Sequence, residues 1–176
     1  MIRKILKTDD ARLRETSRPV GVIDKKILNL IQDLKDTLSA QKDPEGVGLA
    51  APQIGKNLRL FVMLDKKELR VVLNPEIASL EPAKETATSN EKKDSIMEGC
   101  LSLPHYYGPL VRTQKLTLRY KTPEGEKKVE TFEGFTAQII QHEVDHLNGI
   151  LFVDRLLEQK KQLYKQEGVE WVEVDI

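Results

Sequence analysis

The chain has 176 residues, 39% hydrophobic and 32% charged, which is the composition of a protein domain with a buried core. Lysine plus arginine equals aspartate plus glutamate at 28 each, so the composition argues against a general basic field for nucleic acid. With Cys100 as its one cysteine and no signal or bilayer-spanning pattern, we expect a single cytoplasmic domain over residues 1–176, without a disulfide or membrane contact.

The first predicted element is a helix over residues 24–41. Apolar side chains recur there at helical spacing, and Asp24 is placed to cap the start. Residues 43–46, Asp-Pro-Glu-Gly, break the helix. Two β-like runs follow, at residues 58–64 and 69–73, and the short polar segment between them predicts a tight connection.

Residues 81–95 hold no large apolar side chain, and we expect an exposed, mobile polar loop. Residues 111–120 then alternate as a strand, a turn follows, and residues 129–135 form the returning strand. From Thr136 the apolar period becomes helical and ends at Asn148-Gly149, a C-cap signal.

The last segments are an apolar run at residues 150–157, a polar stretch at 158–167 and a strand-like tail at 169–174. Strands precede one central helix that comes late in the chain, which predicts the α+β class. The expected architecture has antiparallel sheets packed around that helix, together with the N-terminal helix and the mobile loop.

The late helix carries the most informative motif, His-Glu-Val-Asp-His at residues 142–146. Positions i and i+4 lie on one helix face, so His142 and His146 can bind a single metal ion. Glu143 directly follows the first of these ligands, so its carboxylate can reach a water on that metal. The motif predicts a metal-binding helix.

Two histidines are an incomplete site, because a catalytic zinc-type centre usually has three protein ligands and one open position. The candidates for the third ligand are a carboxylate, His105 and Cys100. A thiolate suits iron or zinc, but a lone cysteine is also often a small buried apolar residue. Spacing alone leaves both interpretations of Cys100 open. We expect His105 to lie in a surface loop.

Residues 46–55, Gly-Val-Gly-Leu-Ala-Ala-Pro-Gln-Ile-Gly, form a segment rich in small residues. They lack the Gly-Lys-Ser/Thr pattern and the following helix of a phosphate-binding loop, and Pro52 limits helix formation. The structural interpretation is a tight turn between the first helix and the first strand. Gln53 stands out because a side-chain amide in such a loop can donate a hydrogen bond to a substrate oxygen.

In this order, these three segments resemble the motifs of the peptide deformylases. Residues 46–55 are similar to the family's first motif, residues 98–102 (Glu-Gly-Cys-Leu-Ser) to its second, and residues 141–149 to its third. The similarity extends over most of the chain, at residues 10–14, 19–20 and 150–156.

The resemblance implies that Cys100, His142 and His146 hold one divalent metal ion. The family's usual metal is ferrous iron, which zinc, nickel or cobalt can replace. The resemblance also implies that Glu143 is the catalytic acid/base.

The same resemblance implies that the Gln53 side chain and the Leu101 backbone N–H stabilise the oxyanion. The implied substrate is the N-formyl group on the N-terminal formylmethionine of newly made polypeptides, and the products are formate and a free N-terminus. In some relatives a basic C-terminal helix contacts the ribosome, and here only Lys160, Lys161 and Lys165 could serve a transient contact. A solvated face also explains these lysines.

The methionine side chain of such a substrate needs an apolar pocket. Ile139 lies one turn before His142 on the same helix face, and we propose it as lining together with Val47, although both could be ordinary core residues. Gln138 is expected at the rim of this pocket, with Tyr106 and Tyr107 flanking the peptide. The substrate-binding residues that we predict are Val47, Gly48, Gly99, Ile139 and Tyr107.

Three alternatives compete with a deformylase. A zinc endopeptidase would want a distant Glu, His or Asp as its third ligand and a longer cleft. A purely structural metal site usually has four protein ligands, whereas here there are three candidates and a well-placed glutamate. A relative that lost activity would lack some of the named catalytic positions, and all of them are present.

Overall fold

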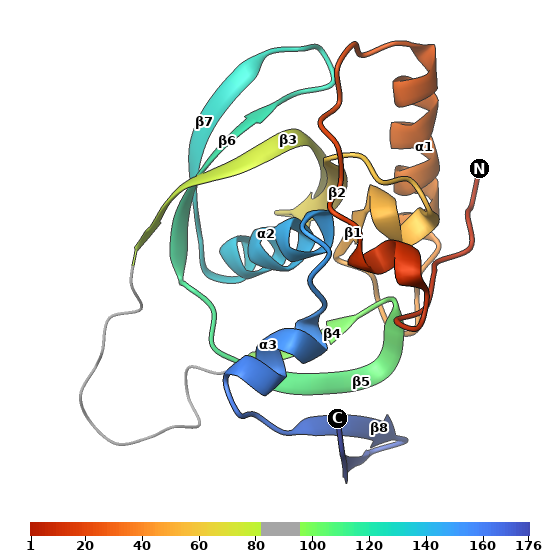
Figure 1. The fold of residues 1–176 in the computed structure, drawn as a ribbon, viewed down its shortest axis with the longest axis vertical. Helices are drawn as coiled ribbons and strands as arrows, with labels where there is room; N and C mark the ends of the chain where they lie inside the picture. Colours follow the sequence, from red (N-terminus) through yellow and green to blue (C-terminus); the bar gives the residue numbers. More distant parts are fainter. Residues whose placement is uncertain (82–95) are drawn as a thin grey trace.

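The computed structural model describes residues 1–81 and 96–176, in which the strands form two antiparallel sheets (Figure 1). The first sheet has the order β1–β2–β3–β6–β7, with β1 at Gly48–Ala50, β2 at Leu60–Asp65, β3 at Glu68–Glu81, β6 at Lys115–Lys121 and β7 at Lys127–Glu133. The second has the order β4–β5–β8–β9, with β4 at Ile96–Cys100, β5 at Leu103–Leu110, β8 at Leu163–Glu167 and β9 at Glu170–Val174. The predicted α+β class with antiparallel sheets is confirmed.

Three α-helices accompany these sheets in the described residues: α1 at Lys25–Ser39, α2 at Gly134–Leu147 and α3 at Phe152–Glu158. Two short 3-10 helices, η1 and η2, lie at Ala11–Arg14 and Ala51–Ile54. The side chain of Asp24 accepts a hydrogen bond from the Ile27 N–H at 3.0 Å, which confirms the predicted cap of α1.

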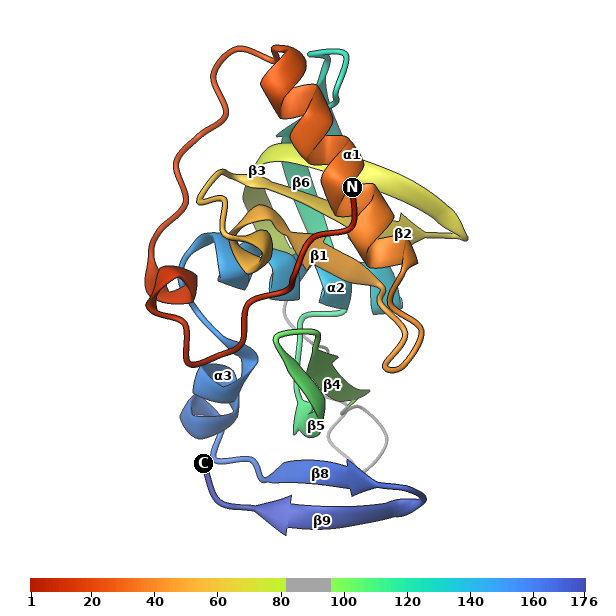
Figure 2. The same cartoon turned by 90° about the vertical axis from the view of Figure 1, so that its right-hand side faces the viewer.

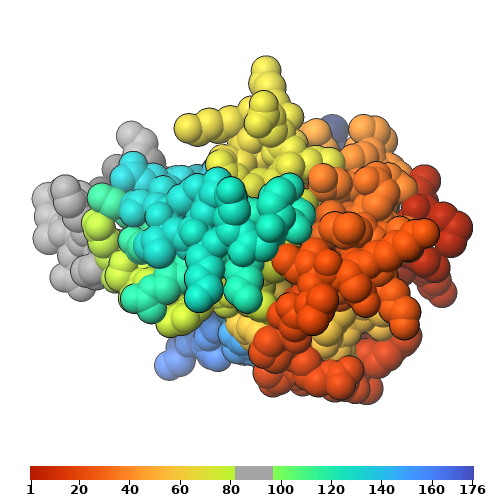
Figure 3. Space-filling model, turned by 90° about the horizontal axis from the view of Figure 1, so that it is seen from above, coloured from red at the N-terminus to blue at the C-terminus, as the bar shows by residue number. Residues whose placement is uncertain are grey.

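The first sheet lies between α1 and α2 (Figure 2). Successive side chains of β2 point to opposite faces, so Leu60 and Val62 pack with α1, while Phe61 and Met63 pack with α2. Both faces of the strand are buried, which explains its continuous apolar run. Seen from above, α1 (orange) and the turn between β6 and β7 (cyan) form neighbouring parts of one face (Figure 3).

The second sheet packs against α3 through a separate apolar cluster. Leu156 of α3, Leu110 of β5 and Leu163 of β8 are all buried in this cluster. Cys100, the last residue of β4, belongs to the same cluster. The second sheet therefore holds Cys100 in position, while the first sheet supports α2.

Several predicted boundaries were wrong. The strand expected at residues 69–73 extends as β3 to Glu81, because its pairing with β6 continues beyond a register shift between Leu73 and Glu76. The strand expected at 111–120 begins only at Lys115. The polar stretch at 158–167 contains β8, whose hydrogen bonds to β5 and β9 the apolar pattern could not indicate.

The glycine-rich segment at residues 46–55 was also misassigned as a tight turn. It contains strand β1 followed by η2, in which Pro52 occupies the first turn, where a proline costs no helical hydrogen bond. The strand-like tail was predicted correctly, as β9.

The structure describes only the first residue of the loop that was predicted at 81–95. Glu81 is the last residue of β3, and residues 82–95 lie outside the described residues, so the mobile loop stays a prediction. In the described ranges, no helix is long and apolar enough to cross a bilayer.

Gly149 ends α2 after the predicted cap residue Asn148, with φ of +73°. A Cβ there would lie 2.4 Å from the carbonyl oxygen of Arg14, whereas Gly168 has φ of +64° and open space around it. We expect Gly168→Ala to lower the free energy of unfolding by about 1 kcal/mol, through backbone strain alone.

Gly149→Ala should lower the free energy of unfolding by about 1–3 kcal/mol more than Gly168→Ala does, because the backbone of Arg14 must also move. Denaturant unfolding of both variants measures this difference. If both variants lost the same free energy of unfolding, the clash with Arg14 would not contribute to stability.

Candidate active site

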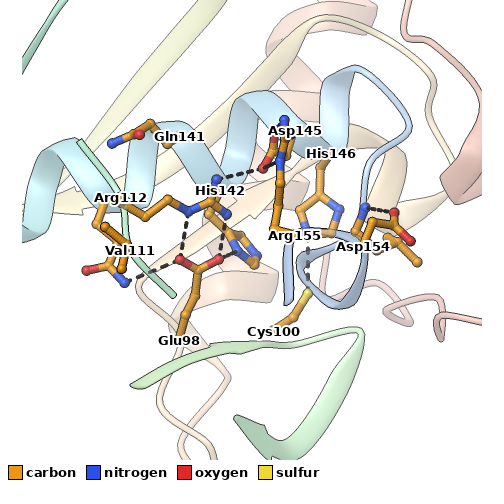
Figure 4. A network of polar contacts seen from close by, with 12 residues as sticks. Glu98, Cys100, Val111, Arg112, Gln141, His142, Asp145, His146, Asp154 and Arg155 are labelled. Atoms are coloured by element: carbon orange, nitrogen blue, oxygen red, sulfur yellow. Dashed lines mark hydrogen bonds and ion pairs between the residues drawn. The ribbon is translucent and has the colours of Figure 1, made fainter. Parts of the chain in front are cut away.

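Cys100 at the end of β4 meets the two histidines of α2. The candidate ligand atoms of Cys100, His142 and His146 all lie within 4.8 Å of one another. The Cys100 Sγ lies 3.2 Å from the His146 Nε2, and the two imidazole rings stand nearly perpendicular with centroids 4.8 Å apart (Figure 4). The structure therefore brings together the three residues that the sequence offered as metal ligands.

Glu98 fixes the orientation of His142. Its Oε1 lies 2.7 Å from the His142 Nδ1, which leaves the Nε2 of this ring for a metal. Burial opposes ionisation of Glu98, but hydrogen bonds from His142 and Arg112 hold the pKa of this carboxyl well below its usual range. Glu98 is therefore a carboxylate that orients the His142 ring through its Nδ1.

Arg112 connects Glu98 to α2. Its guanidinium donates to both carboxylate oxygens of Glu98, at 3.0 and 2.7 Å, and to Asp145 at 2.7 Å (Figure 4). Asp145 also accepts two hydrogen bonds from Arg155 of α3. This buried network fastens the β4 strand, α2 and α3 to one another at the site.

Sequence reasoning did not predict this network. Glu98 lies two residues before Cys100, so strand alternation could have placed both side chains on one face, and Asp145 lies within the histidine motif. Arg112 offered no local signal, because its partners are 14 and 33 residues away.

The electrostatics of the triad suit a divalent cation. Burial raises the pKa of the Cys100 thiol, but His146 and His142 more than offset this and lower it well below its ordinary value. A thiolate with two imidazoles is a ligand set that iron, zinc and related metals accept. The donor set therefore fits one metal ion.

Glu143 lies beside the triad with no partner for one of its oxygens. Its side chain is buried, and its Oε2 has no hydrogen bond to any residue in the ranges 1–81 and 96–176. Burial raises the pKa of this carboxyl to about 7. Gly48 of β1 lies directly against it, since a Cβ there would be 2.3 Å from the Glu143 Oε1. Such an unsatisfied group beside a candidate metal site is expected of a proton-transfer residue rather than a core residue.

Gln53 is held in η2 with its amide nitrogen toward Cys100. Its Oε1 accepts a hydrogen bond from the Ala50 N–H at 2.8 Å, which fixes the direction of the amide. Its Nε2 then lies 3.6 Å from the Cys100 Sγ and 3.2 Å from the Ser102 Oγ. The side chain is therefore ready to donate a hydrogen bond beside the triad.

A cavity of about 380 Å³ opens onto these groups. All of the predicted substrate-binding and oxyanion residues line it, together with Cys100, His142 and Glu143. The predicted lining residues are Val47, Gly48, Gly99, Ile139, Tyr107, Gln53 and Leu101. Ile139 and Val47 also belong to the core beneath α2, so the cavity and core interpretations both hold.

The prediction for His105 was wrong. It lies within β5 rather than in a surface loop, is half-buried and lines the cavity. His105 lies between the pairs Leu103–Cys100 and Tyr107–Gly99, where the register of β5 against β4 shifts, and its φ is +67°. The sequence also missed the lining residues Asp43, Glu45, Met97 and Phe135. Gln138, expected at the rim, lines the cavity but is buried, and it donates to Glu98 at 3.3 Å.

Comparison with known proteins decides the family. The family model for polypeptide deformylase matches residues 2–162. The chain belongs to the peptide deformylase family. The peptide deformylase of Pseudothermotoga lettingae is 38% identical over 172 residues, which cover 98% of this chain and 93% of that protein.

Solved structures of the family agree. The peptide deformylase of Legionella pneumophila has a TM-score of 0.77 and 45% identity, and the match covers 89% of this chain and 86% of that one. The enzyme of Thermotoga maritima has a TM-score of 0.78 and 35% identity, with 88% and 97% covered.

Family membership establishes the activity. This chain is a hydrolase that removes the N-formyl group from newly made polypeptides, as the resemblance implied. The endopeptidase alternative is therefore set aside. The Cys100, His142 and His146 cluster is its candidate site for a single metal ion.

Proposed function

We propose that Cys100, His142 and His146 hold the metal and that Glu143 transfers the protons during deformylation. The observation that carries this proposal is the buried carboxylate of Glu143, whose Oε2 has no hydrogen-bond partner among the described residues, beside three convergent ligand atoms at the wall of one cavity. With three protein ligands, a metal would keep an open position for water, as catalytic sites do.

The metal, when bound, supplies Lewis-acid activation of water and of the formyl oxygen. Glu143 accepts a proton from the water that attacks the formyl carbon. It then delivers this proton to the amide nitrogen as the C–N bond breaks, which releases formate and a free amine.

We propose that Gln53 and Leu101 stabilise the charge that develops on the formyl oxygen. The Ala50 N–H donates to the Gln53 Oε1 and so fixes the orientation of the amide. The Gln53 Nε2 can therefore donate to the formyl oxygen without rearrangement. Leu101 follows Cys100 directly and lines the same cavity, so its backbone N–H is near the reacting group.

The methionine side chain is proposed to bind against Val47 and Ile139. Ile139 contacts the site closely, since its Cγ2 lies 3.1 Å from where a Cβ on Gly48 would be. Gly48 and Gly99 also line the cavity, where the absence of a side chain lets Glu143 and Tyr107 pack closely against them, and Tyr107 is proposed to flank the peptide.

We further propose ferrous iron as the metal, with zinc, nickel or cobalt as replacements, held by α2 as the central metal-binding helix. Ferrous iron and a thiolate ligand both oxidise in air, so protein loaded with iron should lose activity faster in air than protein loaded with nickel. Activity after timed exposure of both forms measures this. Equal rates would contradict iron as the labile centre.

The remaining proposals concern the chain as a whole. We propose one catalytic domain over residues 1–176 that acts in the cytoplasm on N-formylmethionyl nascent peptides. A transient ribosome contact fits a substrate that emerges there. Lys160 is exposed, but Lys165 pairs with Glu167 at 2.6 Å, so the basic surface for such a contact is small.

The direct test is formate release from formyl-Met-Ala-Ser by protein loaded anaerobically with iron or nickel, with metal analysis of the same sample. We expect turnover in proportion to bound metal. Absence of formate from metal-loaded protein would overturn the proposed site.

A further inference from the structure

The register of the second sheet connects the cavity wall to the C-terminal hairpin. Gly99 of β4 pairs with Tyr107 of β5, which pairs with Tyr164 of β8. In the hairpin, Gln166 of β8 pairs with Trp171 of β9. Because side chains alternate along strands and cross-strand partners share a face, Gly99, Tyr107 and Trp171 lie on the same face of this sheet.

Tyr107 and Trp171 are in contact on that face. Their ring centroids are 5.2 Å apart with an interplanar angle of 75°, an edge-to-face pair. The Tyr107 ring also lies over Gly99, since a Cβ there would be 2.7 Å from the ring. Trp171 remains 47% exposed. An aromatic surface therefore continues from the cavity onto β9.

Met97 extends this surface in the other direction. It lies two residues before Gly99 in β4, so it shares the same face of the sheet, and it lines the cavity while remaining 39% exposed.

The hairpin lies beyond the part of the chain that the family model covers. The family match ends at residue 162, and β8 begins at Leu163 (Figures 1 and 2). Trp171 thus lies outside the segment that the family model matches, and it is placed against a residue of the substrate cavity.

We propose that Trp171, together with Tyr107, binds a large apolar side chain at the third residue of the formylated peptide. The proposal rests on the proposed function, in which the methionine enters the cavity. In an extended peptide, alternate side chains lie on one side and about 6.6 Å apart. Tyr107 lines the cavity and its ring centroid lies 5.2 Å from that of Trp171, so the aromatic pair lies within one such step of the cavity wall.

An apolar side chain fits this surface better than a charged one. Met97, Tyr107 and Trp171 supply its apolar area, and the exposed Glu173, two residues after Trp171 in β9, lies on the same face of the sheet. An acidic third residue is therefore disfavoured, and the acidic lining residues Asp43 and Glu45, from the segment before β1, add to this effect. A basic third residue is the competing ligand, because lysine could contact the aromatic rings through its charge.

The test compares formyl-Met-Ala-Phe, formyl-Met-Ala-Lys and formyl-Met-Ala-Ser as substrates of the metal-loaded full chain. We expect Trp171→Ala to lower the ratio of kcat/KM for the Phe peptide over the Ser peptide by about threefold to tenfold, mainly through KM. Trp171→Phe should restore most of the ratio. Val172→Ala is the matched control, since Val172 is 41% exposed on the opposite face of the same strand and should leave the ratio unchanged.

The outcomes separate this inference from the proposed function. No formate from any peptide would contradict the function itself. Formate release with the same Phe-to-Ser ratio in Trp171→Ala and the unaltered chain would overturn only the role of Trp171. A loss confined to the Lys peptide, or an equal effect of Val172→Ala, would also overturn it.

Discussion

Replacing Glu143 by glutamine should lower kcat for formyl-Met-Ala-Ser by about 10²- to 10⁴-fold while leaving the metal bound. Glutamine has nearly the same shape and can occupy the same buried place against Gly48, so the fold should persist. It cannot accept the proton of the attacking water, because an amide is not a base at neutral pH. Steady-state kinetics together with metal analysis of the same preparation measures both expectations.

A control separates proton transfer from a general effect of lost charge. Glu126 is an exposed carboxylate in the turn between β6 and β7, at the far end of the first sheet (Figure 1). Glu126→Gln should retain full turnover. If Glu143→Gln also retained turnover, Glu143 would have no part in the mechanism and would be a buried carboxyl without a role.

Cys100→Ser is expected to lower metal affinity more than about tenfold, and activity with it. Even the loss of a group that only supports a metal ligand commonly costs ten- to a hundredfold in affinity. A serine hydroxyl stays protonated at neutral pH and is a poor replacement for a thiolate, whereas the surroundings of Cys100 lower the pKa of its thiol. Metal content after dialysis against a weak chelator measures the effect.

Ser102→Ala serves as the control for this variant. Ser102 is buried two residues further along the chain and accepts from Gln53, but the metal cluster does not include it. We expect its metal content to equal that of the unaltered chain. If Cys100→Ser kept its metal as well, Cys100 would be a small apolar core residue, the other interpretation that its sequence context allowed.

Local features of the chain were predictable because their physical cause is local. The i and i+4 spacing places His142 and His146 on one face of α2 whatever surrounds it. Asp24 caps α1 through a hydrogen bond within its own first turn. The three short motifs also identified the family, which the comparisons confirm.

Strand boundaries were less predictable because strands form by pairing with distant segments. β3 continues to Glu81 and β8 forms from polar residues, since each finds a partner strand elsewhere in the chain. His105 was misplaced because it lies at a register shift between β4 and β5, which no local pattern of residues indicates.

By itself, then, the sequence determined the helix that offers two imidazoles and a glutamate, and the family to which the chain belongs. Only the tertiary structure decided that the Cys100 Sγ lies 3.2 Å from an imidazole 46 residues away, that Arg112 joins Glu98 to Asp145, and that Trp171 meets Tyr107. The physical reason is the same in each case. Such contacts depend on how two sheets and α2 pack together, and no local pattern of residues encodes that packing.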